Sequence, residues 1–293
     1  MRQHRERFAV FTFTLILLIW GAGAPGFATS YVDPIGKIPA QDEAVYASTT
    51  FDMASHGGWM TPKFLGRYVF YKPPLFYWLA APCVKIFGNR AIAMRLPSIL
   101  ASAATVALVF YWLRATMPFS GAAAGALLLL SSHIFFILSR AGMMDALLAL
   151  EIAIAIHALA RDPHLKSCGA LLEFGCASGA AVMTKSAAGL FPLLALGLLC
   201  LFPKHRPGWA RLAQTAGITA AIALPWHLWQ LYEHPHWFWS EYVLTELLGK
   251  GRGAVVQTTR ESQAGYYLKR LIVLDPVLFL AARWRFTIAI HRI

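Results

Sequence analysis

The sequence predicts an all-α fold, a polytopic transmembrane helical bundle of about eight spans. Three observations lead to this prediction. Hydrophobic residues make up 58% of the 293 positions and charged residues only 14%, whereas roughly a quarter of an ordinary soluble domain is charged. The mean hydropathy of +0.54 is correspondingly high, and apolar segments long enough to cross a bilayer recur along the chain. A soluble protein could not cover so much apolar surface with so few charges.

The apolar segments divide the chain into spans, short connections and two longer polar loops. We expect one domain over residues 1–293. Its first outer loop, at about 30–90, contains an amphipathic helix, and its second outer loop lies at about 232–265. The spans are expected at 8–29, 91–113, 119–139, 144–160, 168–184, 187–203, 211–231 and 266–283.

The first apolar segment fits two interpretations. MRQHRERF, an apolar run and the small residues of GAGAPGFATS are typical of a cleaved secretory signal. The run from Phe8 to Thr29 is about 22 residues long, however, which is enough to cross roughly 30 Å of hydrocarbon. This length favours a retained first helix, and the remaining spans keep the same orientation in either case.

Basic residues predict the orientation, because cytoplasmic loops of membrane proteins are enriched in lysine and arginine. With a cytoplasmic N-terminus every inside loop is short and basic, and the two long loops lie outside. The inside residues are then Arg2, Arg5, Arg7, Arg114, Arg161, Lys166, Lys204, Arg206, Arg211, Arg283, Arg285 and Arg292. This topology accounts for the net charge of +12 without a nucleic-acid partner, since the basic residues form neither a patch nor an aromatic-interleaved stripe.

Six ionisable residues that are far apart in the sequence fall on the outer face in this topology. Ionisable groups near a span are costly and usually functional. Their gathering on one face fits an active site at the outer interface better than it fits a channel. These residues are Asp42, Glu43, Lys72, Asp145, Lys185 and Glu246.

Two motifs in the first loop offer the chemistry of a site. DEAVYA begins at Asp42, where an acid can equally cap a helix or act as a general base near the membrane surface. YKPPLFYWL begins at Tyr71, and its two prolines fix a rigid turn and disfavour helix at Lys72. Interfacial anchoring explains the aromatic rings that follow, whereas a lysine at headgroup height suits pairing with a lipid phosphate.

Acids and lysines also fall at later turns and within spans. RAGMMD ends at Asp145, which is either an ordinary helix cap or a site acid, and TKSAAG places Lys185 where a snorkelling lysine is the simpler explanation. Glu151 and Glu173 lie within predicted spans, where an acid indicates function by default. A hydrogen bond between helices explains both glutamates equally well.

Seven motifs in a fixed order resemble those of the GT-C membrane glycosyltransferases. They are DEAVYA, WMTPKFLGR, YKPPLFYWL, RLPS, RAGMMD, TKSAAG and ALPW, and the resemblance extends to about residue 270. More narrowly, the chain looks like the bacterial branch that includes the aminoarabinose transferase of lipid A and relatives of protein O-mannosyltransferases.

This resemblance implies a transferase that uses a polyprenyl-phosphate sugar at the periplasmic face of the bacterial inner membrane. It implies that Asp42, with Glu43, is the general base or the carboxylate that orients the acceptor. Lys72 would neutralise the departing phosphate, and Asp145 would be a second outer acid. The other residues that the resemblance places at the site are Arg67, Lys185, Lys250 and Arg252 at the donor phosphate, together with Glu246, Tyr266 and Tyr267.

The chain departs from the family pattern in two places. Tyr71 stands where close relatives carry an acid before the Lys-Pro-Pro sequence. A divalent metal ion therefore stays an open question, with its ligands unknown, and no other cofactor is expected. The family continues through further spans and an outer C-terminal domain, whereas the last residues of this chain lose the resemblance. We therefore expect a fragment, a frameshifted product or a naturally short form.

The predicted function is transfer of a hexosyl or pentosyl group from a polyprenyl-phosphate donor to a lipid A-like lipid, a glycan or a protein. In-line attack on the anomeric carbon would invert its configuration. Two alternatives stay open: a catalytically incomplete truncated homologue, and a transporter or flippase for lipid-linked sugars. Transporters are often built from internal repeats, and no repeat stands out in the sequence.

Overall fold

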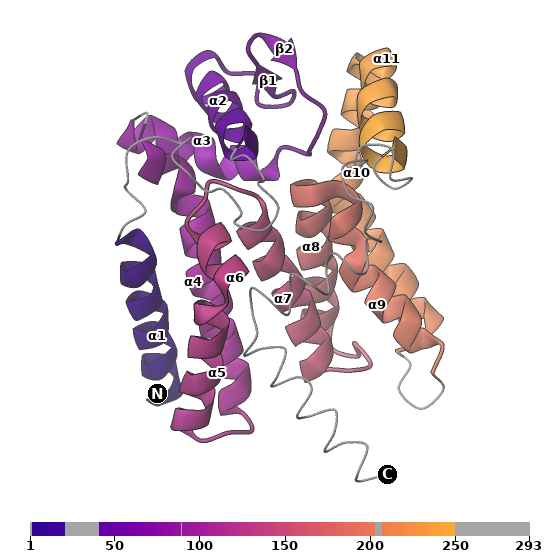
Figure 1. Ribbon diagram of the computed structural model, residues 1–293. Coiled ribbons are helices and arrows are strands. Elements are labelled where there is room, and N and C mark those ends of the chain that lie inside the picture. Colours follow the sequence, from indigo (N-terminus) through magenta and orange to yellow (C-terminus); the bar gives the residue numbers. More distant parts are fainter. Residues whose placement is uncertain (1, 21–40, 89, 203–206, 250–293) are drawn as a thin grey trace, which may run out of the picture.

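The computed structural model describes residues 2–20, 41–88, 90–202 and 207–249, and these ranges are almost entirely helical (Figure 1). A short antiparallel hairpin pairs β1 (Lys63–Phe64) with β2 (Arg67–Tyr68). The prediction of a helical bundle is confirmed for these residues. The helices are α1 (Arg2–Ile19), α2 (Gln41–His56), α3 (Leu75–Phe87), α4 (Ala91–Arg114), α5 (Phe119–Ser131), α6 (His133–Ser139), α7 (Asp145–Arg161), α8 (Cys168–Lys185), the 3-10 helix η1 (Ser186–Leu190), α9 (Phe191–Cys200), α10 (Trp209–Glu233), α11 (Pro235–Trp237) and the π-helix η2 (Phe238–Gly249).

The long helices stand side by side, with α1 packed on α4, α4 on α7, α7 on α8 and α8 on α10 (Figure 1). Glycines allow the last pair to approach closely. Gly175 and Gly179 of α8 face Ile218 and Ile222 of α10, and a Cβ on either glycine would lie 2.7 or 2.8 Å from an isoleucine Cβ. Small residues of this kind are typical where membrane helices pack.

The predicted count of about eight spans stays a prediction, because helix length and composition identify fewer spans among the described residues. Within the described ranges, two helical stretches are long and apolar enough to cross a membrane, Ala91–Arg114 and Cys168–Cys200. A third appears if α5 and α6, which are bent by 72° at Ser132, count as one broken span. The expected span at 266–283 lies outside the described residues.

The stretch from Cys168 to Cys200 is not one straight rod, because η1 turns the chain between α8 and α9. Leu196 of α9 belongs to the same buried cluster as Phe174 of α8. In a straight helix these two residues would lie roughly 33 Å apart, at 1.5 Å per residue. Gly189 lies directly on α8, since a Cβ there would be 2.2 Å from backbone atoms of Ala181 and Val182. We call this turn the α8–α9 elbow.

The two ends of the bundle differ in structure. The helices α2 and α3, the β hairpin and α11 lie over one end, which we call the outer end, and the N-terminus of α1 lies at the opposite, inner end (Figure 1). A buried cluster fixes the outer elements to the bundle: Tyr46 of α2 and Phe76 of α3 pack with Met94 of α4 and Leu147 of α7. Side chains at the outer end are therefore held against the spans.

Candidate active site

Tyr46 marks the centre of a group of acids at the outer end. The tyrosine is buried, at 8% exposure, and its ring meets that of Tyr77 edge-on with centroids 6.1 Å apart. Burial is the main cause that raises the pKa of Tyr46 far above its ordinary value, and the negative charges of Asp42, Asp145 and Glu246 raise it further. Three carboxylates from three separate segments thus lie near one phenol.

The lysine before the double proline forms an ion pair with an acid of η2. Lys72 Nζ contacts Glu246 Oε1, and the two side chains are only 15% and 3% exposed. Pro73 and Pro74 form the turn that precedes α3, which begins at Leu75. Lys72 lies immediately before this turn, as the sequence predicted. The contact joins the two outer loops across 174 positions of sequence.

A second lysine pairs with the acid at the start of α7. Lys185 Nζ lies 2.5 Å from Asp145 Oδ1, and each side chain is a little under one-third exposed. Lys185 is the last residue of α8, and Asp145 is the first residue of α7. Two lysine–carboxylate pairs therefore occupy the outer end, and both carboxylates act on Tyr46.

The two adjacent acids at the start of α2 have different surroundings. Asp42 is exposed, and among the described residues it makes no hydrogen bond or ion pair. Glu43 is 6% exposed, and Oε1 lies 2.7 Å from both Arg95 Nε and the amide nitrogen of Gly142. Glu43 thus joins α2 to α4 and to the turn before α7, while Asp42 faces solvent.

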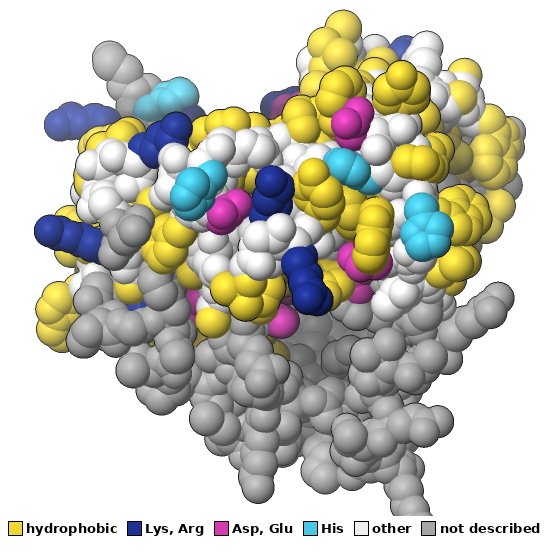
Figure 2. Space-filling view, turned by 90° about the horizontal axis from the view of Figure 1, so that it is seen from above, with side chains coloured by type: hydrophobic (Ala, Val, Ile, Leu, Met, Phe, Trp, Pro, Cys, Tyr) yellow, Lys and Arg dark blue, Asp and Glu magenta, His cyan; other side chains and the backbone are white. Residues whose placement is uncertain are grey.

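The other predicted site residues divide into those the structure describes and those it does not. Arg67 lies in β2 and is exposed. Lys250, Arg252, Tyr266 and Tyr267 lie outside the described residues. Within the described ranges, no three histidine, cysteine, aspartate or glutamate side chains gather as they would around a metal ion. The surface of the outer end carries acidic, basic and histidine side chains among hydrophobic ones (Figure 2).

Sequence reasoning missed several residues that support the site. Tyr46 follows Asp42 by four positions, the spacing that places two residues on one face of a helix, and this spacing could have revealed it. Arg95 lies in the RLPS motif, but nothing in the sequence pairs it with Glu43. Thr184, next to Lys185, donates a hydrogen bond of 2.9 Å to Glu151, which is a hydrogen bond between helices, as one interpretation of Glu151 expected.

An apolar groove of about 490 Å³ opens between α3, α8 and α10. Leu75 and Trp78 line it near the double proline, and Trp226 and Trp229 line it from α10. Trp226 Nε1 also donates a 2.7 Å hydrogen bond to the carbonyl of Met60, which ties the first loop to this wall. The groove lies beside the segment that carries Lys72.

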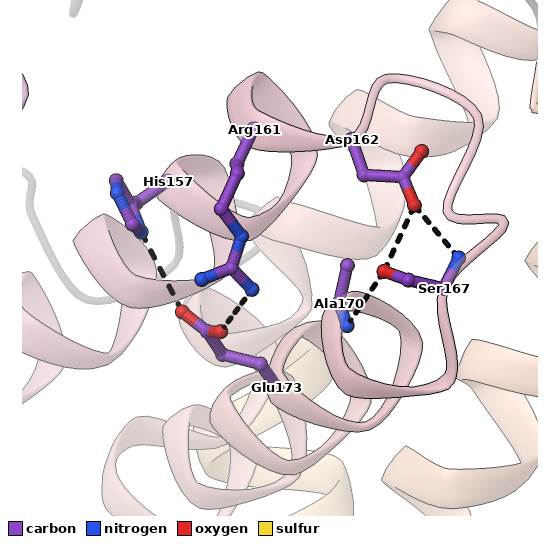
Figure 3. A network of polar contacts seen from close by, with 6 residues as sticks. All are labelled: His157, Arg161, Asp162, Ser167, Ala170 and Glu173. Carbon is purple, nitrogen blue, oxygen red and sulfur yellow. Dashed lines mark hydrogen bonds and ion pairs between the residues drawn. The ribbon is translucent and has the colours of Figure 1, made fainter. Parts of the chain in front are cut away.

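The inner end carries a separate polar network (Figure 3). Glu173 Oε2 accepts a 2.6 Å hydrogen bond from Arg161 Nη2, and Glu173 Oε1 lies 3.5 Å from His157 Nδ1. Asp162 accepts hydrogen bonds from the backbone amide and the hydroxyl of Ser167. The hydrogen bond from the backbone amide is the main cause that lowers the pKa of Asp162. These contacts fasten α7 to α8 and give Glu173 a structural role.

The fold and the site together define a helical membrane protein with paired lysines and acids at one end. The chain belongs to the dolichyl-phosphate-mannose-protein mannosyltransferase family, whose model matches residues 71–229, more than half of the chain. It is thus a member of the GT-C membrane glycosyltransferases, which confirms the family prediction.

Curated relatives carry the name undecaprenyl phosphate-alpha-4-amino-4-deoxy-L-arabinose arabinosyl transferase. The Yersinia enterocolitica protein is 29% identical over 245 residues, which cover 77% of this chain and 44% of the relative. The Aeromonas salmonicida protein is 27% identical over 230 residues, which cover 74% of this chain and 42% of the relative. The chain therefore spans less than half the length of these relatives.

Two solved structures share the fold at 20% sequence identity. ArnT from Cupriavidus metallidurans bound to undecaprenyl phosphate matches with a TM-score of 0.72, over 94% of this chain and 51% of that chain. The S. cerevisiae protein O-mannosyltransferase Pmt1-Pmt2 complex bound to the sugar donor matches with a TM-score of 0.57, over 80% and 34%. The arrangement of helices described above is thus that of known members of this class.

Proposed function

We propose that this chain transfers a sugar from a polyprenyl-phosphate donor to a lipid A-like lipid, a glycan or a protein. The outer end lies at the periplasmic face of the bacterial inner membrane, and the N-terminus lies in the cytoplasm. The names of the curated relatives support this donor class, and so does the ligand of the similar ArnT structure.

One observation carries the proposal: two ion pairs, Lys72 with Glu246 and Lys185 with Asp145, gather at the outer end, where burial, their acids and Asp42 all raise the pKa of Tyr46. Lys72 and Lys185 come from the first loop and from the end of α8. Placing ionisable groups near membrane spans costs free energy, so residues that pay this cost are usually functional. The gathering of these charges from distant parts of the sequence therefore favours a functional role. Paired lysines suit an anionic ligand, whose phosphate would replace the carboxylates as their partner.

Lys72 and Lys185 act on the leaving group. The bond between the anomeric carbon and the phosphate oxygen breaks, and its electron pair stays on that oxygen. Fixed cations at this position stabilise the negative charge as it develops, and they need no rearrangement when held in place beforehand. The Pro73–Pro74 turn and the elbow after Lys185 provide that rigidity. Arg67, Lys250 and Arg252 are proposed to assist at the phosphate.

Asp42 acts on the acceptor. Its carboxylate is exposed in the first turn of α2, so an entering hydroxyl can reach it. The acceptor oxygen forms the new bond to the anomeric carbon and gives its proton to Asp42, and in-line attack inverts the configuration. With a phosphate acceptor, already ionised, Asp42 orients the acceptor and takes no proton. Glu43 positions Asp42 through its contacts to Arg95 and Gly142.

The apolar groove beside α3 accommodates the prenyl chain of the donor. Its walls are almost entirely apolar or aromatic side chains, and a hydrocarbon chain gains roughly 0.8 kcal/mol for each buried CH₂ group. Leu75 lies in this groove three positions after Lys72. A phosphate at Lys72 and a chain in the groove would therefore belong to one lipid.

The test is sugar transfer in membranes that contain the full chain and a labelled polyprenyl-phosphate sugar. Asp42→Asn should lower transfer by about 10²-fold or more, the usual contribution of a general base. Asp52→Asn is the matched control, because Asp52 lies on the same helix and its carboxylate pairs with the exposed His56, at 3.2 Å. Equal activity in the two variants would contradict the role of Asp42, and a folded wild type without transfer to any acceptor would contradict the function.

A further inference from the structure

Ser186 lies at the α8–α9 elbow, beside one of the two ion pairs of the proposed site. It follows Lys185 directly, and Lys185 pairs with Asp145. On its other side is Tyr242 of η2: burial raises the pKa of Tyr242 to about 12, and the nearby Ser186 hydroxyl acts in the opposite direction. Tyr242 precedes Glu246, the partner of Lys72, by four positions. Ser186 is thus next to one site lysine and near the acid that holds the other.

The backbone at Ser186 adopts a conformation that L-amino acids avoid. Its φ is 50° and its ψ is −123°, and such strained positions cluster at functional sites. The close seat of Gly189 on Ala181 and Val182 holds the turn in this shape. The elbow therefore fixes where the Ser186 side chain points.

The hydroxyl of Ser186 is buried and lacks a hydrogen-bond partner among the described residues. The side chain is 6% exposed, and its oxygen is shielded from solvent. The phenol of Tyr242 lies close by and is 2.7 Å from His227 Nε2, but Ser186 and Tyr242 are not in hydrogen-bonding geometry with each other. A buried hydroxyl without a partner destabilises the protein, and this cost is recovered if a ligand supplies an acceptor.

Other buried hydroxyls also lack partners, among them Thr49 and Ser102. Those two lie within the regular helices α2 and α4, whereas Ser186 has a left-handed backbone and is adjacent to Lys185. Ser178 shows what a satisfied serine on α8 looks like: its hydroxyl donates a 2.8 Å hydrogen bond to the carbonyl of Phe174. The elbow turns Ser186 away from this kind of local partner.

We propose that the Ser186 hydroxyl donates a hydrogen bond to the phosphate group of the polyprenyl-phosphate donor. This inference rests on the proposed function and adds a binding residue to its site. Phosphate oxygens are strong acceptors, and a charged acceptor makes a short, strong bond with a hydroxyl. Binding separates Lys185 from Asp145 and Lys72 from Glu246, and it brings the phosphate to both lysines and to the hydroxyl that has no other acceptor.

The experiment measures the dissociation constant of undecaprenyl phosphate for the full chain in nanodiscs. The fluorescence of Trp78, Trp226 and Trp229, which line the groove, reports binding. Ser186→Ala should weaken binding about tenfold or more, the effect expected for one hydrogen bond to a charged group. Ser178→Ala is the matched control and should bind as the wild type does, since it removes the same group from α8, eight positions before Ser186 and away from the site.

Two further arms separate the hydroxyl from the backbone and the phosphate from the chain. Ser186→Gly relieves the left-handed backbone and also lacks the hydroxyl, so it should bind as weakly as Ser186→Ala; wild-type binding by either variant would overturn the inference. Undecaprenol, which lacks phosphate, should bind equally to wild type and variants, and a matching loss with undecaprenol would mean a damaged groove and overturn it too. In a competition arm, millimolar inorganic phosphate is added to the bound lipid. If it displaces the lipid from the wild type but not from Ser186→Ala, the hydroxyl binds free phosphate and the inference is overturned.

The outcomes for this inference and for the proposed function are distinguishable. Wild-type protein that binds undecaprenyl phosphate while Ser186→Ala binds it equally well would overturn only the role of Ser186. Folded wild-type protein that binds no undecaprenyl phosphate would overturn the proposed function and this inference together.

Discussion

Neighbouring acids at the start of α2 show how the surroundings of a single residue decide its role. Asp42 and Glu43 are chemically almost alike and adjacent in sequence, yet one faces solvent and the other is buried against Arg95. A buried carboxylate is stable only with its charge and hydrogen bonds satisfied. Glu43 meets this condition through Arg95 and Gly142, so its first contribution is to hold α2 in place.

Replacing Glu43 by alanine should destabilise the protein by about 3–5 kcal/mol, the usual cost of leaving one member of a buried ion pair alone. The charge of Arg95, itself 8% exposed, would then lack this carboxylate. Thermal unfolding in detergent measures the effect, and adding Arg95→Met should recover part of the loss. A melting temperature that does not change in Glu43→Ala would contradict the structural role.

The candidate site residues could be proposed from sequence motifs, but their partners could not. Asp42, Lys72, Asp145, Lys185 and Glu246 were singled out by their motifs and positions, and the structure pairs Lys72 with Glu246 and Lys185 with Asp145. Their partners come from distant helices: Lys72 and Glu246 are 174 positions apart. No local pattern encodes such a pairing, since it depends on how the helices pack.

At the scale of elements, the α8–α9 elbow is the feature on which the site depends most. The sequence predicted two spans with a short connection, but it did not reveal a left-handed serine or a glycine seated on the preceding helix. The reason is physical: the conformation of η1 is set by contact with α8, whereas helix periodicity reports only which residues are apolar. The bend between α5 and α6 at Ser132 escaped prediction for the same reason.

Gly189→Ala should destabilise the protein by about 1–3 kcal/mol, because a new Cβ would meet the backbone of α8 at 2.2 Å and overpacking costs this much. Gly197→Ala on α9 is the matched control. Its Cβ would lie 3.9 Å from Leu212, and alanine in a helix interior should leave stability equal or raise it.

Chemical denaturation or thermal unfolding of the two glycine variants decides the point. Sugar transfer should also fall in Gly189→Ala, because the elbow positions Lys185 and Ser186. Equal stability of Gly189→Ala and Gly197→Ala would contradict the packing of η1 on α8.

At the scale of the whole molecule, polar chemistry is divided between two ends. The outer end carries the lysine–carboxylate pairs, and the inner end carries structural contacts such as Arg161 with Glu173 and Arg114 with Glu6. The distribution of basic residues predicted this division. Figure 1 places the turns that contain Arg114 and Arg161 at the end opposite α2 and α3.

A native cysteine allows the orientation to be measured. Cys168 is exposed at the start of α8, at the inner end, so a membrane-impermeant maleimide should label it in inverted vesicles and not in intact cells. A cysteine introduced at Lys63, in β1 of the outer end, should show the opposite pattern. Cys168→Ser identifies the native signal, and labelling of Cys168 from outside intact cells would contradict the proposed topology.

The most direct test of the central claim is to count products from a sugar-labelled, phosphate-labelled polyprenyl donor in proteoliposomes that contain the full chain and an acceptor lipid. A glycosyltransferase cleaves the donor, so we expect one polyprenyl phosphate released for each sugar transferred. Lys72→Met should lower both rates together by about 10²–10³-fold, the loss typical when a group that stabilises developing negative charge is removed. Lys63→Met, in the same loop, should leave both rates unchanged. Movement of intact donor across the bilayer without cleavage would contradict the account and favour a flippase.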